Sequence, residues 1–185
     1  MKKILSHIFK RKSQIKDEKY SKIVLPKIIE FSEIIKTKKN ISFLHSGHLG
    51  DIINSLPVIK ELSKKKICNL YIQKDKKIPS HVISREGSTN SVFLKEQSII
   101  KILPLLNNQT FINKVEIFNN QFIDIDLNFF RELPINFNID SVRWYFHLTG
   151  CFPDLSRSYL EVQPNKNYEN YIVIMRSLRR QNKHI

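Results

Sequence analysis

The stretch that decides the fold is ISFLHSGHLGDIINSLPVIKELSKKKICNLYI, residues 41–72. Its apolar run at 41–45 stops before a glycine, which is typical of a short strand covered on both faces. Apolar residues then recur at helical spacing from Ile52 to Leu62, and the segment ends in lysines that suit a helix carboxyl end. A second apolar run follows at 68–72. Strand, glycine turn, helix and strand within about 30 residues form a βαβ unit, which predicts a parallel sheet.

Further elements are expected on either side of this unit. Apolar residues near helical spacing predict an amphipathic helix over about 22–36. Downstream, the patterns predict a loop at 73–91, a helix at 96–108 interrupted at Pro104, strands at 114–118 and 122–127 separated by an Asn-rich turn, a helix at 140–150 capped by Gly150, and a strand at 159–162. The predicted fold class is therefore α/β: a three-layer Rossmann-like domain with a mainly parallel sheet, preceded by a basic helical lead-in.

The chain divides into three parts on this interpretation. Residues 1–40 are the basic helical extension, 41–164 the Rossmann-like domain, and 165–185 a linker with a further strand at 171–176. The polar linker resembles a domain boundary. We therefore expect the last strand to open a second domain that is otherwise missing, the alternative being that it completes the first sheet.

The formal charge of +14 invites a nucleic-acid or an anionic-membrane interpretation. Its lysines are dispersed in short runs at expected element ends, where solvated charge is typical, and no recognised nucleic-acid motif is present. Nucleic acid is therefore not the expected partner. The amphipathic helix at 22–36 leaves an anionic membrane surface open as a partner, or it packs on the domain that follows.

The amino terminus begins like a signal peptide, but its apolar segment is broken by Ser6, His7 and Lys10. No apolar stretch approaches the roughly 20 residues that span a bilayer. We expect a cytoplasmic protein, either free or peripheral at the inner face of the membrane.

Cofactor and metal motifs are not found in the sequence. The first turn is not GxGxxG, and a GxxxxGK[ST] phosphate loop is absent. Cys68 and Cys151 lie far apart, and His45 and His48 lack an acidic or cysteine complement. We expect no cofactor, no metal and no disulfide.

Asp51 is the residue most suggestive of chemistry, because it lies just after a strand end, where open α/β sheets place ligands. It has two interpretations: an acid stabilised in the first turn of a helix, or a carboxylate that accepts a proton from an attacking hydroxyl. Because of Pro57, two positions are possible for the start of the helix. A start at Asp51 would put the proline after the first turn, where it should kink the helix, whereas Ser55 as N-cap would put it in the first turn.

Three stretches resemble the heptosyltransferase-like glycosyltransferases (glycosyltransferase family 9). The first is the Gly-Asp turn and the following helix with its Leu-Pro pair, and the others are FIDIDLNFFRELP at 122–134 and YIVIMRSLRRQN at 171–182. The residues that match the first motif are Gly50, Asp51, Leu56, Pro57 and Leu62.

The resemblance implies the amino-terminal half of a GT-B architecture, whose two Rossmann-like domains bind acceptor and donor on either side of a cleft. It makes Asp51 the general base. It implies acceptor-binding roles for Gly47, His48 and Gly50, to which Asp126 is added from its place at a strand end. Cations for the donor diphosphate would come from Arg176, Arg179 and Arg180.

The expected reaction is sugar transfer from a nucleotide-sugar donor to a glycan or lipid-linked acceptor, as in the synthesis of lipopolysaccharide or other cell-surface glycans. Because most of a donor domain is missing, we expect the chain to be inactive unless a separate donor domain completes it. The alternatives are a basic nucleic-acid-binding protein and a non-catalytic remnant or scaffold.

Overall fold

The computed structural model describes residues 18–78, 92–133 and 140–162, and its centre is a four-stranded sheet. The strands are β1 (Asn40–His45), β2 (Ile67–Ile72), β3 (Lys114–Ile117) and β4 (Ile125–Asp126). Their order is β3-β2-β1-β4, and all three pairings are parallel. The predicted βαβ unit is confirmed, and the sheet is entirely rather than mainly parallel.

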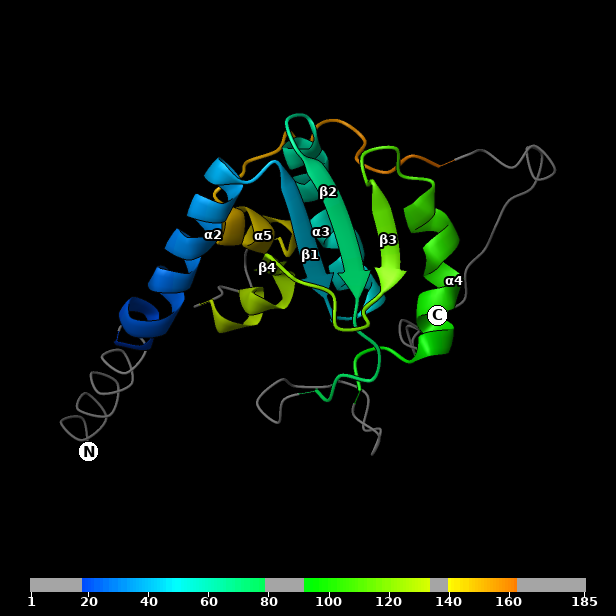
Figure 1. Cartoon of the computed structure of the whole chain (residues 1–185), viewed down its shortest axis with the longest axis horizontal. Coiled ribbons are helices and arrows are strands. Elements are labelled where there is room, and N and C mark those ends of the chain that lie inside the picture. Colours follow the sequence, from blue (N-terminus) through cyan, green and yellow to red (C-terminus); the bar gives the residue numbers. More distant parts are fainter. Residues whose placement is uncertain (1–17, 79–91, 134–139, 163–185) are drawn as a thin grey trace, which may run out of the picture.

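Helices flank this sheet in a Rossmann-like three-layer arrangement, as the sequence predicted (Figure 1). They are the π-helical turn η1 (Tyr20–Val24), α2 (Leu25–Thr37), α3 (Leu49–Ser63), α4 (Glu96–Asn107), the 3-10 helix η2 (Leu127–Glu132) and α5 (Val142–Thr149). In Figure 1, α3 lies behind β1 and β2, α4 lies beside β3, and α2 and α5 lie on the β4 side.

The two central strands bury apolar side chains mainly on one face of the sheet. Ile41, Phe43, Leu70 and Ile72 are fully buried on that face and join one core cluster with the inner face of α3. The other face is less covered, since Ser42 and Leu44 of β1 are only partly buried, so the expectation of a strand covered on both faces is only partly met.

The amino-terminal helix packs on the domain. Val24 and Phe31 are buried in the common core, and the ring of Phe31 meets Phe129 edge to face at 6.0 Å between centroids. One face of this helix therefore packs on the domain, which is one of the two roles predicted for it. Its other face remains exposed.

Pro57 and Pro104 both lie inside helices, and neither proline ends its helix. Helix α3 begins at Leu49 with His48 as N-cap, so both expected starts, at Asp51 and after Ser55, are wrong. Pro57 is buried within α3, and Pro104 lies in the last turn of α4 without interrupting it. Core packing of the buried Pro57 offsets the missing N–H bond there, whereas Pro104 is exposed.

The strands expected at 114–118 and 122–127 are present but do not form neighbours. β3 is one edge of the sheet and β4 is the other, and both run parallel to the strands between them. The connecting residues recross the sheet, and Asp124 is buried there, accepting hydrogen bonds from Lys38 and from the N–H of Ser42. Asp124 is therefore a buried acid whose two carboxylate oxygens each accept a hydrogen bond.

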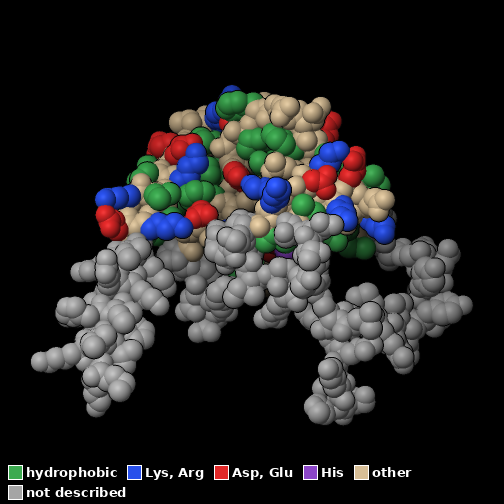
Figure 2. All heavy atoms as spheres, turned by 90° about the horizontal axis from the view of Figure 1, so that it is seen from below, with side chains coloured by type: hydrophobic (Ala, Val, Ile, Leu, Met, Phe, Trp, Pro, Cys, Tyr) green, Lys and Arg blue, Asp and Glu red, His purple; other side chains and the backbone are tan. Residues whose placement is uncertain are grey.

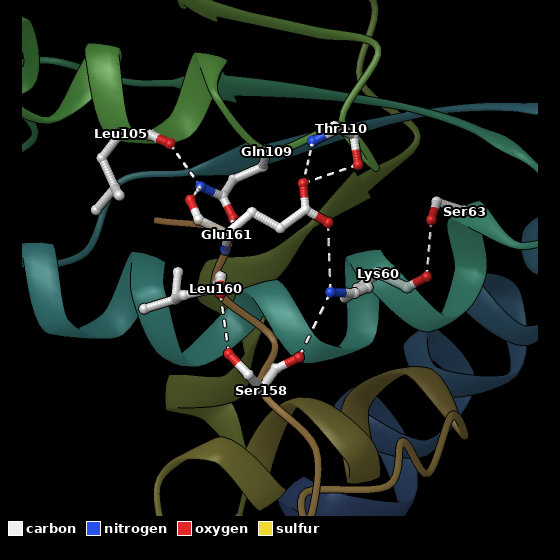
Figure 3. Close-up of polar contacts among 8 residues, drawn as sticks. All are labelled: Lys60, Ser63, Leu105, Gln109, Thr110, Ser158, Leu160 and Glu161. Carbon is white, nitrogen blue, oxygen red and sulfur yellow. Dashed lines mark hydrogen bonds and ion pairs between the residues drawn. The ribbon is translucent and has the colours of Figure 1, made fainter. Parts of the chain in front are cut away.

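The strand expected at 159–162 is not formed. Instead, the side chain of Gln109 exchanges two hydrogen bonds with the backbone of Glu161, at 2.9 and 3.0 Å, as a partner strand would (Figure 3). The Glu161 carboxylate accepts from the N–H and hydroxyl of Thr110, both at 2.8 Å. We call Gln109, Thr110 and Glu161 the clasp. It ties the segment after α5 to the end of α4.

Residues 163–185 lie outside the described residues, so the strand expected at 171–176 and the boundary of a second domain remain predictions. Helix α5 ends as predicted, because Gly150 adopts the left-handed conformation with φ of 67° and donates to the carbonyl of Phe146. Among the described residues, no helix has the length and apolar character needed to cross a bilayer.

Candidate acceptor site at the topological switch point

The candidate site lies at the carboxyl ends of β1 and β4. Strand order runs from β1 through β2 to β3 in one direction, and β4 then returns to the other side of β1. Such a reversal opens the sheet edge to a ligand, because the connections leave the two neighbouring strands on opposite sides. The turn from β1 into α3 and the start of η2 meet here.

Asp51 is held at this point by two hydrogen bonds to one of its oxygens. Its Oδ2 accepts from the N–H of His48 at 3.0 Å, which caps α3, and from Nη2 of Arg131 at 2.6 Å. Its Oδ1 accepts no hydrogen bond from any described residue, and the side chain remains 22% exposed. The carboxylate is thus oriented through Oδ2, while Oδ1 has no hydrogen-bond partner among the described residues.

Arg131 reaches Asp51 from η2 and lies over two aromatic rings. The guanidinium carbon lies 4.4 Å from the centre of the Phe93 ring and 4.5 Å from that of Phe130. Cation–π contacts with two rings stabilise the guanidinium in this position. Its Nε is buried and has no hydrogen-bond partner in the described part of the chain.

A buried chain of hydrogen bonds holds the turn between β1 and α3 in place. The N–H of Gly47 donates to Nδ1 of His45 at 3.0 Å, so the ring proton is on Nε2, which lies 2.9 Å from the hydroxyl of Tyr145. That hydroxyl donates in turn to the carbonyl of Asp51 at 3.0 Å. Burial lowers the pKa of His45 to about 3, so the ring is neutral at physiological pH.

Burial also raises the pKa of Tyr145 well above its usual value. The phenol therefore stays protonated and keeps its donor role. Together, His45 and Tyr145 fix the backbone on either side of the glycine turn.

The two glycines of the turn serve different purposes. A Cβ on Gly47 would lie 2.8 Å from Oδ2 of Asp51 and 2.9 Å from Nη2 of Arg131, so the ion pair requires glycine there. A Cβ on Gly50 would meet nothing within 4 Å. Gly50 lies in the first turn of a helix, where alanine is more favourable, and packing gives no reason for its identity.

Asp126 contributes a second carboxylate at the end of β4. Its Oδ1 accepts from the backbone and side-chain nitrogens of Asn128 at 2.9 and 2.6 Å, and the amide oxygen of Asn128 accepts from the N–H of Ser46 at 2.8 Å. Its Oδ2 accepts nothing from the described residues. The hydroxyl of Ser46 is buried without a hydrogen-bond partner there. Asn128 therefore joins Asp126 to the residue that follows β1.

His48 lies at the exposed rim, where its ring meets Phe93 edge to face at 5.2 Å. The five predicted residues Gly47, His48, Gly50, Asp51 and Asp126 thus all belong to the switch point. The predicted phosphate-binding residues Arg176, Arg179 and Arg180 lie outside the described residues.

Sequence reasoning missed half of the site: Arg131, His45, Tyr145, Asn128 and Phe93. Arg131 lies within the stretch that resembles the glycosyltransferases, but no spacing rule links it to Asp51. Tyr145 lies in the helix expected at 140–150, but no sequence signal indicates the partners of its buried hydroxyl.

The surface at the carboxyl edge has mixed charge. Figure 2 views the molecule from this end and shows acidic and basic side chains interspersed among the described residues, with no continuous basic face in view. Among those residues, no three His, Cys, Asp or Glu side chains gather as metal ligands would. The polar atoms of the site without a hydrogen-bond partner among the described residues are one oxygen each of Asp51 and Asp126 and two buried groups, Nε of Arg131 and the hydroxyl of Ser46.

Comparison with known proteins identifies no relative. No family model, no curated protein and no solved structure matches the chain.

Proposed function

We propose that this chain is the acceptor-binding half of a glycosyltransferase of the heptosyltransferase type, with GT-B architecture. The observation that carries the proposal is the state of Asp51: a partly exposed carboxylate after the first strand, anchored through Oδ2, whose Oδ1 accepts no hydrogen bond from the described residues. The hydroxyl groups of a sugar suit such a carboxylate, because each hydroxyl can donate a hydrogen bond to it.

Asp51 acts as the general base in this proposal. The acceptor hydroxyl donates to Oδ1, and its proton passes to that oxygen as the acceptor oxygen bonds to the anomeric carbon of the donor. The bond from that carbon to the diphosphate breaks at the same time, and the nucleoside diphosphate leaves with the electron pair. Arg131 orients the carboxylate through Oδ2 and so aims Oδ1.

Gly50 keeps the first turn of α3 bare, so that the acceptor can approach the backbone beside Asp51. The cost of glycine at a helical position, about 1 kcal/mol relative to alanine, is then explained by ligand access. The donor sugar nucleotide binds to a separate donor domain. Arg176, Arg179 and Arg180 are the residues proposed to contact its diphosphate.

The reaction is proposed to take place in the cytoplasm at the inner face of the membrane, where a lipid-linked acceptor would be presented. On this proposal the product is a lipopolysaccharide or another cell-surface glycan.

The proposal is tested by acceptor binding, which does not require the donor half. We expect titration of the isotope-labelled chain with free hexoses, heptoses and lipopolysaccharide core oligosaccharides to shift amide signals at 47–51 and 126–131 in two-dimensional NMR spectra. Asp51→Asn should weaken the binding at least about tenfold, because one acceptor oxygen becomes an amide. Asp154→Asn, a change of the same kind at an exposed acid, should leave it unchanged. No shifts with any of these sugars, or shifts that Asp51→Asn leaves unchanged, would overturn the proposal.

A further inference from the structure

Two short lysine runs meet at the amino edge of the sheet, which lies opposite the candidate site. Residues 36–39 lead into β1 and residues 64–66 lead into β2, and together they hold six lysines and no acid. The sequence predicted dispersed charge because α3 separates the two runs. The parallel pairing of β1 with β2 brings them side by side, and Nζ of Lys66 donates to the carbonyl of Lys38 at 2.7 Å (Figure 1).

Half of this positive charge is not neutralised by neighbouring acids. Three of the six lysines form ion pairs with carboxylates: Lys36, Lys38 and Lys64. The other three form no ion pair with any described residue: Lys39, Lys65 and Lys66. We call these three residues the lysine edge. Like charges on adjacent turns repel one another, so an anion that bridges them is stabilised.

An exposed phenylalanine lies next to these lysines. Phe122 is 75% exposed, and Nζ of Lys38 lies 4.7 Å from the centre of its ring. The same ammonium group pairs with the buried carboxylate of Asp124, which holds it in place beside the ring. Phe122 therefore presents an aromatic surface to solvent directly beside a cluster of cations.

Amide side chains continue this surface on the face of the sheet that α3 does not cover. Asn40 and Ile67 are paired across β1 and β2 and are both exposed. Asn69 lies on the same face, two residues further along β2, and its side-chain oxygen accepts from the side chain of Asn113 at 2.8 Å. Amides both donate and accept hydrogen bonds, as the edges of unstacked bases require.

We propose that the amino edge of the sheet binds single-stranded nucleic acid. The lysine edge contacts the phosphates, a base stacks on Phe122, and the amides of Asn40 and Asn69 reach base edges. This combination favours a single strand over other polyanions. Bases in a duplex are stacked on each other and do not reach the ring, and the carboxylates of an acidic peptide carry no planar group to stack.

This binding surface lies at the opposite edge of the sheet from Asp51, so it goes beyond the proposed transfer reaction and does not rest on it. The mixed charge visible in Figure 2 belongs to the carboxyl edge, at the other end of the molecule. A sugar acceptor and a nucleic acid strand would therefore occupy separate surfaces, and each could bind while the other is present.

The cationic contacts are tested by fluorescence anisotropy of labelled single-stranded RNA and DNA of about twelve random nucleotides, mixed with the full chain. We expect Lys39→Gln, Lys65→Gln and Lys66→Gln together to weaken binding at least about tenfold at about 50 mM salt. The slope of log K against log salt should fall by about 2, since each phosphate contact on a single strand contributes roughly 0.7. The control replaces three exposed lysines elsewhere that also form no ion pair with a described residue: Lys77, Lys95 and Lys101. It should leave both values unchanged.

Stacking is tested at Phe122, whose exposure lets the side chain change without loss of the fold. Phe122→Leu should weaken binding about fivefold or more with an unchanged salt slope, because base stacking is not an ionic contact. Phe122→Trp should keep the affinity, since it retains an aromatic surface. A duplex of the same sequence should bind more weakly than either strand.

The proposal fails if neither oligonucleotide binds, if the lysine-edge variant loses no more affinity than its control, if the duplex binds as tightly as a single strand, or if Phe122→Leu keeps full affinity. Tighter binding of polyglutamate or of phosphatidylglycerol vesicles would assign the surface to another partner and overturn it as well. On binding, amide signals of 38–40, 65–67 and 122 should shift in NMR spectra, while those of 47–51 stay in place. The sugar titration reports on the latter signals, so the two proposals fail separately.

Discussion

Arg131 donates a 2.6 Å hydrogen bond to Asp51 from eighty positions further along the chain. The pair links the turn after β1 to the helix after β4, and both side chains are mostly buried. Removal of one partner from such a pair leaves the other charge poorly solvated, so the pair contributes to folding as well as to orientation. Asp51, which the sequence presents only as a candidate base, therefore also stabilises the fold.

The energy of this pair can be measured with a double-mutant cycle of Asp51→Asn and Arg131→Gln. We expect a coupling free energy of about 1–2 kcal/mol from urea unfolding, because the partners are partly desolvated and the guanidinium lies over two rings. The pair of Arg157 and Asp154, exposed and 3.7 Å apart, is the control and should couple by less than about 0.5 kcal/mol. Equal coupling in both cycles would contradict the role assigned to burial.

The two glycines of the turn should respond oppositely to alanine. Gly47→Ala should lower the free energy of unfolding by about 1–3 kcal/mol, since the new methyl group must displace Asp51, His45 or Arg131. Gly50→Ala should raise it by up to about 1 kcal/mol, because the Cβ meets no atom and alanine favours the helix. Urea unfolding of the two variants tests this difference directly.

Gly50→Ala should also separate stability from binding. The added methyl group projects over the first turn of α3, where the proposed acceptor approaches, so a more stable protein should bind sugar more weakly. A variant that is both more stable and equally competent in the NMR titration would argue against backbone approach at Gly50.

Acid should destabilise the protein through His45. The pKa of this side chain is lowered from 6.5 to about 3 by burial, so below pH 6.5 the unfolded chain takes up a proton that the folded protein does not. The free energy of unfolding should therefore fall by about 2 kcal/mol from this group alone between neutral pH and pH 5. In His45→Gln the decrease measured over the same range should be smaller by about that amount. An unchanged pH dependence would show that the ring is not held neutral.

The clasp should contribute to stability through Gln109 in particular. Gln109→Leu removes both bonds to the backbone of Glu161 and one to the carbonyl of Leu105, so we expect a loss of about 2 kcal/mol. Hydrogen exchange at the backbone amide of Glu161 should be faster in this variant. Gln97→Leu, an exposed change in α4, should lie within about 0.5 kcal/mol of the parent protein.

The sheet core was predictable because its signals are local. The apolar run of β1, the helical spacing of α3 and the apolar run of β2 follow one another along the chain, and each implies its own conformation. The helix start at Leu49 was missed because the cap is made by Asp51 from inside the helix rather than by a preceding Ser, Thr, Asp or Asn side chain. Pro57 then pointed to the wrong boundary.

The places of 114–118 and 122–127 in the sheet were not predicted, for a different reason. An Asn-rich turn between two short strands is typical of a hairpin, but here the connecting residues cross back to the other edge of the sheet. Asp124 in this connection is held by hydrogen bonds that it accepts from Lys38 and from the N–H of Ser42. The site was half predictable: Gly47, Gly50 and Asp51 lie together in sequence. Arg131 and Tyr145 reach them only through the tertiary fold, and neither residue type carries a spacing signal.

The β1–β4 pairing, which brings together residues more than eighty positions apart, has a consequence for the order of folding. The βαβ unit can close early because its contacts are near in sequence, whereas β4 must wait for the rest of the sheet and is held by only two residues of ladder. We expect this seam to be the last part of the domain to form and the first to open. A molecule bound across it would hold together the two segments that separate first, and so would lengthen the lifetime of the folded protein.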